Sequence, residues 1–324
     1  MPKELVALER GKPVIREYKE EPLPEGYIRV KVEFGSPKHG TELTLYHGNR
    51  GAKFPMGLGN MCTGRVTEIG KGVEGFSLGE RVAGYGHLRE THTWPAKNIL
   101  KMNKRMSWKE AVCFDPAQFA LAGIRDGHIR LGDKVAIFGL GAIGQMAAQM
   151  VRMAGAIFVA AIDPIKIRRE VALKSGVDMV LDPTSQDVGS ELKKITGGTG
   201  VDVVIETSGN YKALNQALKG LAYGGNVAYV GWAKECKGGL DLGEVAHFKV
   251  PNIIFARACS EPNRDYPRWD FARIKDTCWK LLSEGKLQCE EIIQPVVPFS
   301  ESAEAYKEYI EYHPEKSIKL GVKF

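Results

Sequence analysis

The stretch KVAIFGLGAIGQMAAQM, from Lys134 to Met150, decides the fold. It begins with the continuous apolar run Lys134–Phe138, turns through three glycines and continues as a helical pattern. Apolar runs of this length are typical of parallel strands that are buried on both faces. Strand and helix patterns then alternate, with further apolar runs at Ile157–Ile162, Asp202–Ile205 and Val227–Val230. This alternation predicts an α/β domain with a doubly wound parallel sheet of the Rossmann type.

The turn between this strand and helix reads G-x-G-x-x-G over Gly139–Gly144. Its backbone N–H groups and the positive end of the helix dipole suit a pyrophosphate. Asp163 ends the next apolar run, where a carboxylate can bind the adenosine ribose and repel the extra phosphate of NADP. We therefore expect NAD as the cofactor, with Arg168 over the adenine. The basic residues around Arg168 keep NADP open as an alternative.

The sequence before this domain indicates a different architecture. Tyr27–Phe34, Cys62–Ile69 and Glu80–Tyr85 alternate apolar and polar residues, as half-buried strands do, and glycine-rich turns separate them. These patterns predict a compact, barrel-like domain. The tail after Ser260 is too short to fold alone, so we expect it to complete that first domain. The expected boundaries are residues 1–117 with 262–324 for the first domain, and 118–261 for the second.

Composition excludes several classes of protein. The 324 residues include 45 Lys and Arg against 39 Asp and Glu, and the net charge of +6 is dispersed, which argues against a nucleic-acid partner. We find neither an apolar run long enough to span a membrane nor a signal peptide. The six cysteines are irregularly spaced and form no C-x-x-C pair, as in reduced intracellular proteins. We expect a cytoplasmic protein.

The order of these patterns resembles the medium-chain dehydrogenase/reductase superfamily, that is, the zinc alcohol dehydrogenases and their relatives, over nearly the whole chain. Val201–Gly209 (VDVVIETSG) and Gly224–Gly231 (GGNVAYVG) are similar to that family's segments beside the nicotinamide. The resemblance implies a GroES-like catalytic domain, hydride transfer between an alcohol and NAD, and a homodimer or homotetramer. The implied cofactor-binding residues are Gly139, Leu140, Gly141, Ala142, Ile143, Gly144, Asp163, Arg168, Thr207 and Gly231.

The segment His39-Gly40-Thr41-Glu42 resembles the family's C-G-[ST]-D motif. In the family the cysteine binds zinc and the hydroxyl passes the substrate proton, so the resemblance gives these positions to His39 and Thr41. The family's third zinc ligand corresponds to Asp115, whereas its histidine ligand corresponds to Asn60. The implied catalytic residues are His39, Thr41 and Asp115.

The family's structural-zinc lobe is absent, and the catalytic metal site is incomplete. His39 and Asp115 are candidate ligands, but a catalytic zinc needs three protein ligands and a water. Cys62 is expected to face away from them. We favour a metal-free site and keep bound zinc as an alternative. Without metal, His39 is the expected base because its ordinary pKa is near neutrality, Thr41 relays the proton, Asp115 orients the imidazole, and Lys38 is a second possible acceptor.

Without the structural-zinc lobe, the chain resembles the branch of the family that contains bacteriochlorophyllide hydroxyethyl dehydrogenases and sugar or polyol dehydrogenases. We expect an NAD-dependent alcohol dehydrogenase or carbonyl reductase that acts on a small alcohol or ketone, at a secondary hydroxyl of a sugar, a polyol or another polar small molecule. The segment Glu261–Asp270 either grips a sugar with Tyr266 and Trp269 or is a loop anchored by Trp269. Two other functions stay open. One is a zinc-free enone or quinone reductase that uses NADPH, and the other is a non-catalytic NAD-binding protein.

Overall fold

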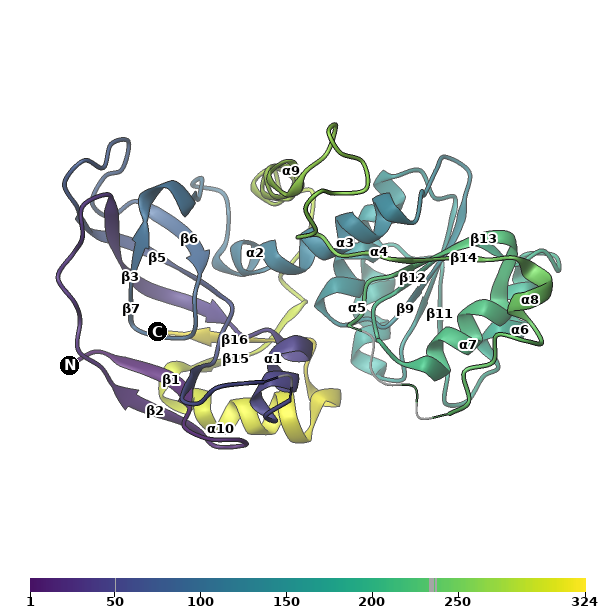
Figure 1. Ribbon diagram of the computed structural model, residues 1–324, viewed down its shortest axis with the longest axis horizontal. Helices are drawn as coiled ribbons and strands as arrows, with labels where there is room; N and C mark the ends of the chain where they lie inside the picture. Colours follow the sequence, from purple (N-terminus) through teal and green to yellow (C-terminus); the bar gives the residue numbers. More distant parts are fainter. Residues whose placement is uncertain (50, 233–235, 237) are drawn as a thin grey trace. The chain divides into compact units, whose positions relative to one another are not determined.

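The computed structural model describes residues 1–49, 51–232, 236 and 238–324, and the chain divides into two units (Figure 1). The first unit comprises Met1–Asp115 with Leu282–Phe324, and the second comprises Pro116–Leu281. The C-terminal segment thus returns to the first unit. The second boundary differs from the expected one, because residues 262–281 lie in the second unit.

Contacts of Trp269 explain that difference. Arg125, in α3 (Phe114–Asp126), forms an ion pair with Asp265, and its guanidinium carbon lies 3.7 Å from the centroid of the Trp269 ring. Arg273, in α9 (Phe271–Ser283), lies 4.4 Å from the same ring. The contacts of Arg125 hold this segment to the second unit, whereas Arg273 belongs to the segment itself and packs on the same ring from within it. Trp269 is therefore an anchor, which favours that interpretation of residues 261–270 over a sugar-stacking surface.

The second unit is built on a six-stranded parallel sheet in the order β11-β10-β9-β12-β13-β14. The strand order reverses between β9 and β12, and this is the topological switch point at which doubly wound sheets bind ligands. Helices flank the sheet (Figure 1). The strands are β9 (Lys134–Phe138), β10 (Phe158–Ile162), β11 (Met179–Leu181), β12 (Val201–Glu206), β13 (Leu221–Tyr229) and β14 (Asn252–Phe255). Besides α3 and α9, the helices are α4 (Ala142–Met153), α5 (Lys166–Lys174), α6 (Val188–Ile195), α7 (Tyr211–Gly220) and α8 (Ala246–Lys249).

The first unit is strand-rich. A three-stranded sheet has the order β2-β1-β4, and a larger sheet has the order β15-β16-β3-β5-β6-β8, with β7 also paired to β3. The C-terminal strand β16 pairs with β3 near the middle of that sheet. The strands are β1 (Lys3–Ala7), β2 (Pro13–Glu17), β3 (Tyr27–Ser36), β4 (Met56–Gly57), β5 (Met61–Ile69), β6 (Arg81–Tyr85), β7 (Thr91–Pro95), β8 (Leu100–Lys101), β15 (Ile293–Pro298) and β16 (Lys319–Lys323).

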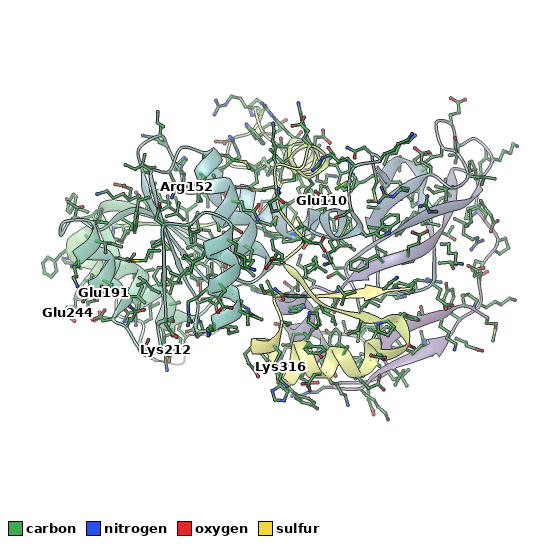
Figure 2. The ribbon with its side chains drawn as sticks, turned by 180° about the vertical axis from the view of Figure 1, so that it is seen from behind. Glu110, Arg152, Glu191, Lys212, Glu244 and Lys316 are labelled. Carbon is green, nitrogen blue, oxygen red and sulfur yellow. The ribbon has the colours of Figure 1, made fainter. Side chains whose placement is uncertain are left out.

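Local sequence explains several of these elements. The alternation in β3 buries Ile28, Val30 and Val32 in the core of the first unit. Helix α2 (Trp108–Val112) begins with a capping box, in which Ser107 accepts the N–H of Glu110 and the Glu110 carboxylate accepts the N–H of Ser107. Figure 2 labels Glu110 on this helix. The first unit also contains α1 (His39–Tyr46), α10 (Ser302–Tyr306), the π-helical turn Lys307–Tyr312 and the short 3₁₀ turns Ala96–Asn98, Phe299–Glu301 and Pro314–Lys316.

No helix in the described part of the chain is both long enough and apolar enough to cross a membrane. The predicted class, a Rossmann-type parallel sheet together with a strand-rich domain, is confirmed.

Candidate functional site

The glycine loop after β9 is shaped for a close approach to its backbone. Gly139 has a φ of +88°, a backbone conformation that residues other than glycine rarely adopt. A Cβ on Gly144 would collide with the Gly139 carbonyl oxygen, so the start of α4 packs directly against the turn. Gly141 is the N-cap of α4, and no described atom lies within 4 Å of where its Cβ would be. The N-terminus of α4 therefore opens to a phosphate-sized group.

Asp163 follows β10 and is buried. Its Oδ2 accepts the N–H of Leu140 at 2.7 Å, and its Oδ1 accepts the N–H of Ile165 at 2.8 Å. Each carboxylate oxygen can accept a further hydrogen bond, so ribose hydroxyls can still bind. Arg168 Nη1 lies 3.7 Å from Oδ2. This cation offsets the carboxylate charge and weakens the repulsion of a ribose phosphate.

The loops after β12 and β13 meet the glycine loop. The Thr207 hydroxyl donates to the Gly139 carbonyl at 2.8 Å, and a Cβ on Gly231 would lie 2.5 Å from the Gly209 nitrogen. All the expected cofactor residues follow the carboxyl ends of β9, β10, β12 or β13. They therefore gather at the edge of the sheet where ligands of this fold bind.

Glu206, the last residue of β12, is fully buried and is not among the site residues that the sequence predicts. Its carboxylate accepts the N–H groups of Ser208 and Gly209, each at 2.9 Å, and the Ser208 hydroxyl. Burial raises the pKa of Glu206. The sequence signal that could have found this residue is an acid directly at the end of a buried strand.

The candidate catalytic segment is held by the C-terminal strand. The Leu320 N–H donates to His39 Nε2 at 3.0 Å, and the Ser36 hydroxyl donates to the Leu320 carbonyl at 2.6 Å. The buried ammonium of Lys319 donates to the Pro37 carbonyl at 2.7 Å. Because His39 accepts through Nε2, the neutral ring carries its proton on Nδ1. The Nε2 lone pair, which His39 would need to accept a proton as a base, is therefore engaged by the Leu320 N–H.

Asp115 pairs with a lysine. Lys38 Nζ lies 3.2 Å from Oδ1 and 3.0 Å from Oδ2 of Asp115. The lysine side chain is 26% exposed, whereas the carboxylate is largely buried. Thr41 lies in the first turn of α1, two residues after His39. The structure thus joins Asp115 to the segment of His39 and Thr41 through Lys38, a different arrangement from the expected Asp115–imidazole pair.

Glu42 supports this segment from within the first unit. It is buried, and its Oε2 accepts the Gly59 N–H at 2.8 Å. The Tyr306 hydroxyl faces the carboxylate, but neither Glu42 Oε1 nor Tyr306 Oη has a well-formed hydrogen bond within the described residues. Burial raises the pKa of Glu42 to about 7. This acid is therefore costly to ionise in the folded protein.

These residues do not fit a catalytic metal. His39 Nε2 is engaged with Leu320, Asp115 is paired with Lys38, and the buried amide nitrogen of Asn60, itself a donor, has no partner in the described structure. The Cys62 thiol donates to the His87 carbonyl at 3.3 Å, and burial raises its pKa to about 12. No group of three or more His, Cys, Asp or Glu side chains suited to a metal occurs among the described residues.

Comparison with known proteins identifies the family of the chain. Residues 24–105 match the family model described as an alcohol dehydrogenase GroES-like domain, and residues 142–268 match the model described as a zinc-binding dehydrogenase. The chain is 45% identical to D-guloside 3-dehydrogenase of Escherichia coli (strain K12), covering 99% of this chain and all of the relative. It is 30% identical to L-threonine 3-dehydrogenase of Pyrococcus abyssi, covering 90% and 91%.

Solved structures share the fold at lower identity. The chain superposes on 2R,3R-butanediol dehydrogenase from Bacillus subtilis with a TM-score of 0.82 at 21% identity, over all of both chains. It superposes on galactitol-1-phosphate dehydrogenase from Escherichia coli with a TM-score of 0.82 at 20% identity, over 99% and 100%. The chain therefore belongs to the medium-chain dehydrogenase/reductase superfamily, as an alcohol dehydrogenase-like oxidoreductase that acts on CH–OH groups.

Proposed function

We propose that the chain oxidises a secondary ring hydroxyl of a glycoside or related polyol with NAD⁺. A hydride passes from the carbinol carbon to the nicotinamide, and the hydroxyl loses a proton, which gives a ketone, NADH and H⁺. The switch point between β9 and β12, where sheets of this kind bind dinucleotides in a crevice, carries the proposal together with the glycine loop and Asp163. The 45% identity to D-guloside 3-dehydrogenase makes carbon 3 of a guloside the first position to test.

The preference for NAD rests on Asp163. Its buried carboxylate has acceptor capacity for both ribose hydroxyls and opposes a second anionic group at the same place. Arg168 reduces that opposition without removing it, because its nearest nitrogen is 3.7 Å from the carboxylate. We therefore propose NAD as the better cofactor, bound by residues 139–144, Asp163, Arg168, Thr207 and Gly231.

For the proton, we propose that Thr41 holds the substrate hydroxyl and passes its proton to His39. The imidazole can accept it only after the Leu320 N–H bond to Nε2 breaks. A single hydrogen bond of this kind contributes about 1 kcal/mol net, so substrate binding can offset the loss. Lys38, held by Asp115, supplies a fixed positive charge that stabilises the alkoxide-like oxygen. No step passes through a metal.

The test uses methyl D-guloside carrying deuterium at carbon 3, with NAD⁺ and with NADP⁺. We expect the deuterium to appear in the reduced nicotinamide and the sugar to become the 3-ketone, faster with NAD⁺. The matched control is the galactoside, which differs only in configuration at carbon 3. Transfer from another carbon would correct the position, and the absence of transfer across a panel of glycosides and polyols would overturn the proposal.

The same experiment separates the alternatives. A zinc-free enone or quinone reductase would consume NADPH with a conjugated ketone and would leave the sugar unchanged. A non-catalytic NAD-binding protein would bind the cofactor without turnover. The observation that favours a dehydrogenase over both is that groups able to handle a proton lie together, because Lys38, in the segment of His39 and Thr41, pairs with Asp115.

A further inference from the structure

Glu206 stands at the switch point of the parallel sheet. It pairs in register with Phe138 at the end of β9 and with Tyr229 at the end of β13. Its carboxylate binds the loop of residues 207–209, and Thr207 of that loop bonds the glycine turn. Any movement of the carboxylate therefore affects the backbone that borders the dinucleotide crevice.

The geometry also indicates which half of the cofactor lies near Glu206. Asp163 follows β10, on one side of the switch point, and is the residue suited to the adenosine ribose. A dinucleotide crosses the switch point from one half of the sheet to the other. The nicotinamide therefore lies on the side of β12, where Glu206 ends the strand.

Glu206 differs from the buried acids Asp115 and Asp163 in the cations that surround its carboxylate. Those two buried acids have a cation beside them, Lys38 and Arg168 respectively. Glu206 receives hydrogen bonds from two backbone N–H groups and one hydroxyl, all neutral, and no described lysine or arginine pairs with it. A buried carboxylate without a counter-ion is costly, so its retention points to a ligand that supplies the positive charge.

We propose that Glu206 is a positioning residue whose negative charge favours the cationic ring of NAD⁺ over the neutral ring of NADH in the crevice. This inference rests on the proposed cofactor site. The oxidised nicotinamide ring is positively charged, and that charge disappears when the ring gains a hydride. A carboxylate nearby therefore stabilises the oxidised cofactor relative to the reduced one. Since product release limits many enzymes, weaker NADH binding suits oxidation of the alcohol.

The test measures the dissociation constants of NAD⁺ and NADH, without substrate, for wild type, Glu206→Gln and Glu206→Asp. If the substitution only loosens the loop of residues 207–209, the binding of both cofactors weakens by a common factor, which cancels in the ratio Kd(NAD⁺)/Kd(NADH). Loss of the charge removes an attraction that only the cationic ring of NAD⁺ has, while its effect on the pyrophosphate is common to both cofactors, so we expect the ratio to rise about five- to tenfold in Glu206→Gln. Glu206→Asp keeps the charge, and its ratio should stay within about twofold of wild type.

Each outcome bears on the inference. An unchanged ratio in Glu206→Gln, with both affinities lowered equally, would overturn the electrostatic role. If that variant does not fold, Glu206→Ser replaces it, because the smaller side chain leaves room for water to accept the same N–H groups, and the same rise is required. If wild type binds neither nicotinamide cofactor, the proposed function itself fails, which is distinguishable from an unchanged ratio.

Discussion

Replacing Glu42 with glutamine should stabilise the protein at alkaline pH. Glu42 is buried, and one of its oxygens lacks a well-formed hydrogen bond in the described structure. Glutamine has nearly the same shape but cannot ionise. Its oxygen can accept the Gly59 N–H, and its amide can donate to Tyr306 Oη, which faces the same side chain. The variant therefore resembles the protonated form of wild type.

The magnitude follows from the two pKa values. The ordinary pKa of Glu42 is 4.5, and burial raises it to about 7 in the folded protein. The folded state therefore holds the proton more tightly, and the stability linked to protonation is complete below pH 4.5 and lost as pH rises through about 7. At 1.36 kcal/mol per pKa unit, the ionised wild type is destabilised by up to about 3 kcal/mol. Glu42→Gln should avoid this loss.

The assay is urea unfolding of both proteins between about pH 5 and about pH 8, compared as the difference in the free energy of unfolding. We expect a small difference at the acid end that grows by about 2–3 kcal/mol in favour of Glu42→Gln toward the alkaline end. Glu74→Gln, an exposed acid in the same unit, is the matched control and should show no such trend. A difference that is independent of pH, or that favours wild type most at alkaline pH, would refute the reasoning.

Four further predictions concern the reaction. Asp163→Ser should weaken the binding of NAD(H) and tighten that of NADP(H), because it removes the charge that opposes a ribose phosphate. Titration that shows wild type binding NADP(H) more tightly than NAD(H) would contradict this prediction. His39→Ala should leave NAD affinity nearly unchanged and lower turnover by about 10²–10⁴-fold, and a full rate would place the proton chemistry elsewhere. Lys38→Met should lose more turnover than Lys38→Arg, since only arginine keeps the charge beside Asp115; equal losses would count against that role. Purified enzyme should keep its activity after chelation and hold zinc well below one equivalent, and activity restored only by zinc would show that the site binds metal.

The cofactor unit could be predicted from the sequence because its signals are local. The apolar run, the three glycines and the acid after the next strand lie within about 30 residues, as in one β-α-β unit. Each of these signals has a local structural explanation, such as the positive φ of Gly139 and the hydrogen bond from the Leu140 N–H to Asp163. Pattern and spacing therefore sufficed to predict the strand, the turn and the helix of this unit.

The candidate catalytic segment could be predicted only in part, because its partners are distant in sequence. The family motif indicated His39 and Thr41, but the group that engages His39 is the N–H of Leu320, 281 residues away. The pairing of Lys38 with Asp115 spans 77 residues. Periodicity and spacing report on local structure, so neither contact could be predicted, and neither could the helical start of α1 at His39.

The boundary between the two units also depends on contacts that local sequence patterns do not reveal. Residues 261–270 are polar and rich in turns, which is typical of a linker, and the expected boundary followed that composition. The contacts of Arg125 with Trp269 and Asp265 hold the segment to the second unit instead. A cation–π contact between residues far apart in the chain leaves no periodic signal in either segment.

Three features distinguish this site from a catalytic metal site: the pairing of Lys38 with Asp115, the hydrogen bond to His39 Nε2, and the amide of Asn60. Asp115 is largely buried, and a buried carboxylate needs a nearby positive charge, which a metal ion or an ammonium group can supply. Lys38 supplies it here, so Asp115 remains compensated without a metal. With that charge in place, a second cation at the same carboxylate would be opposed by the lysine. His39 Nε2 is engaged by the Leu320 N–H, and Asn60 offers an amide. To form a three-ligand site, Asn60 would have to be replaced, and the metal would have to displace the Leu320 N–H from His39 and Lys38 from Asp115.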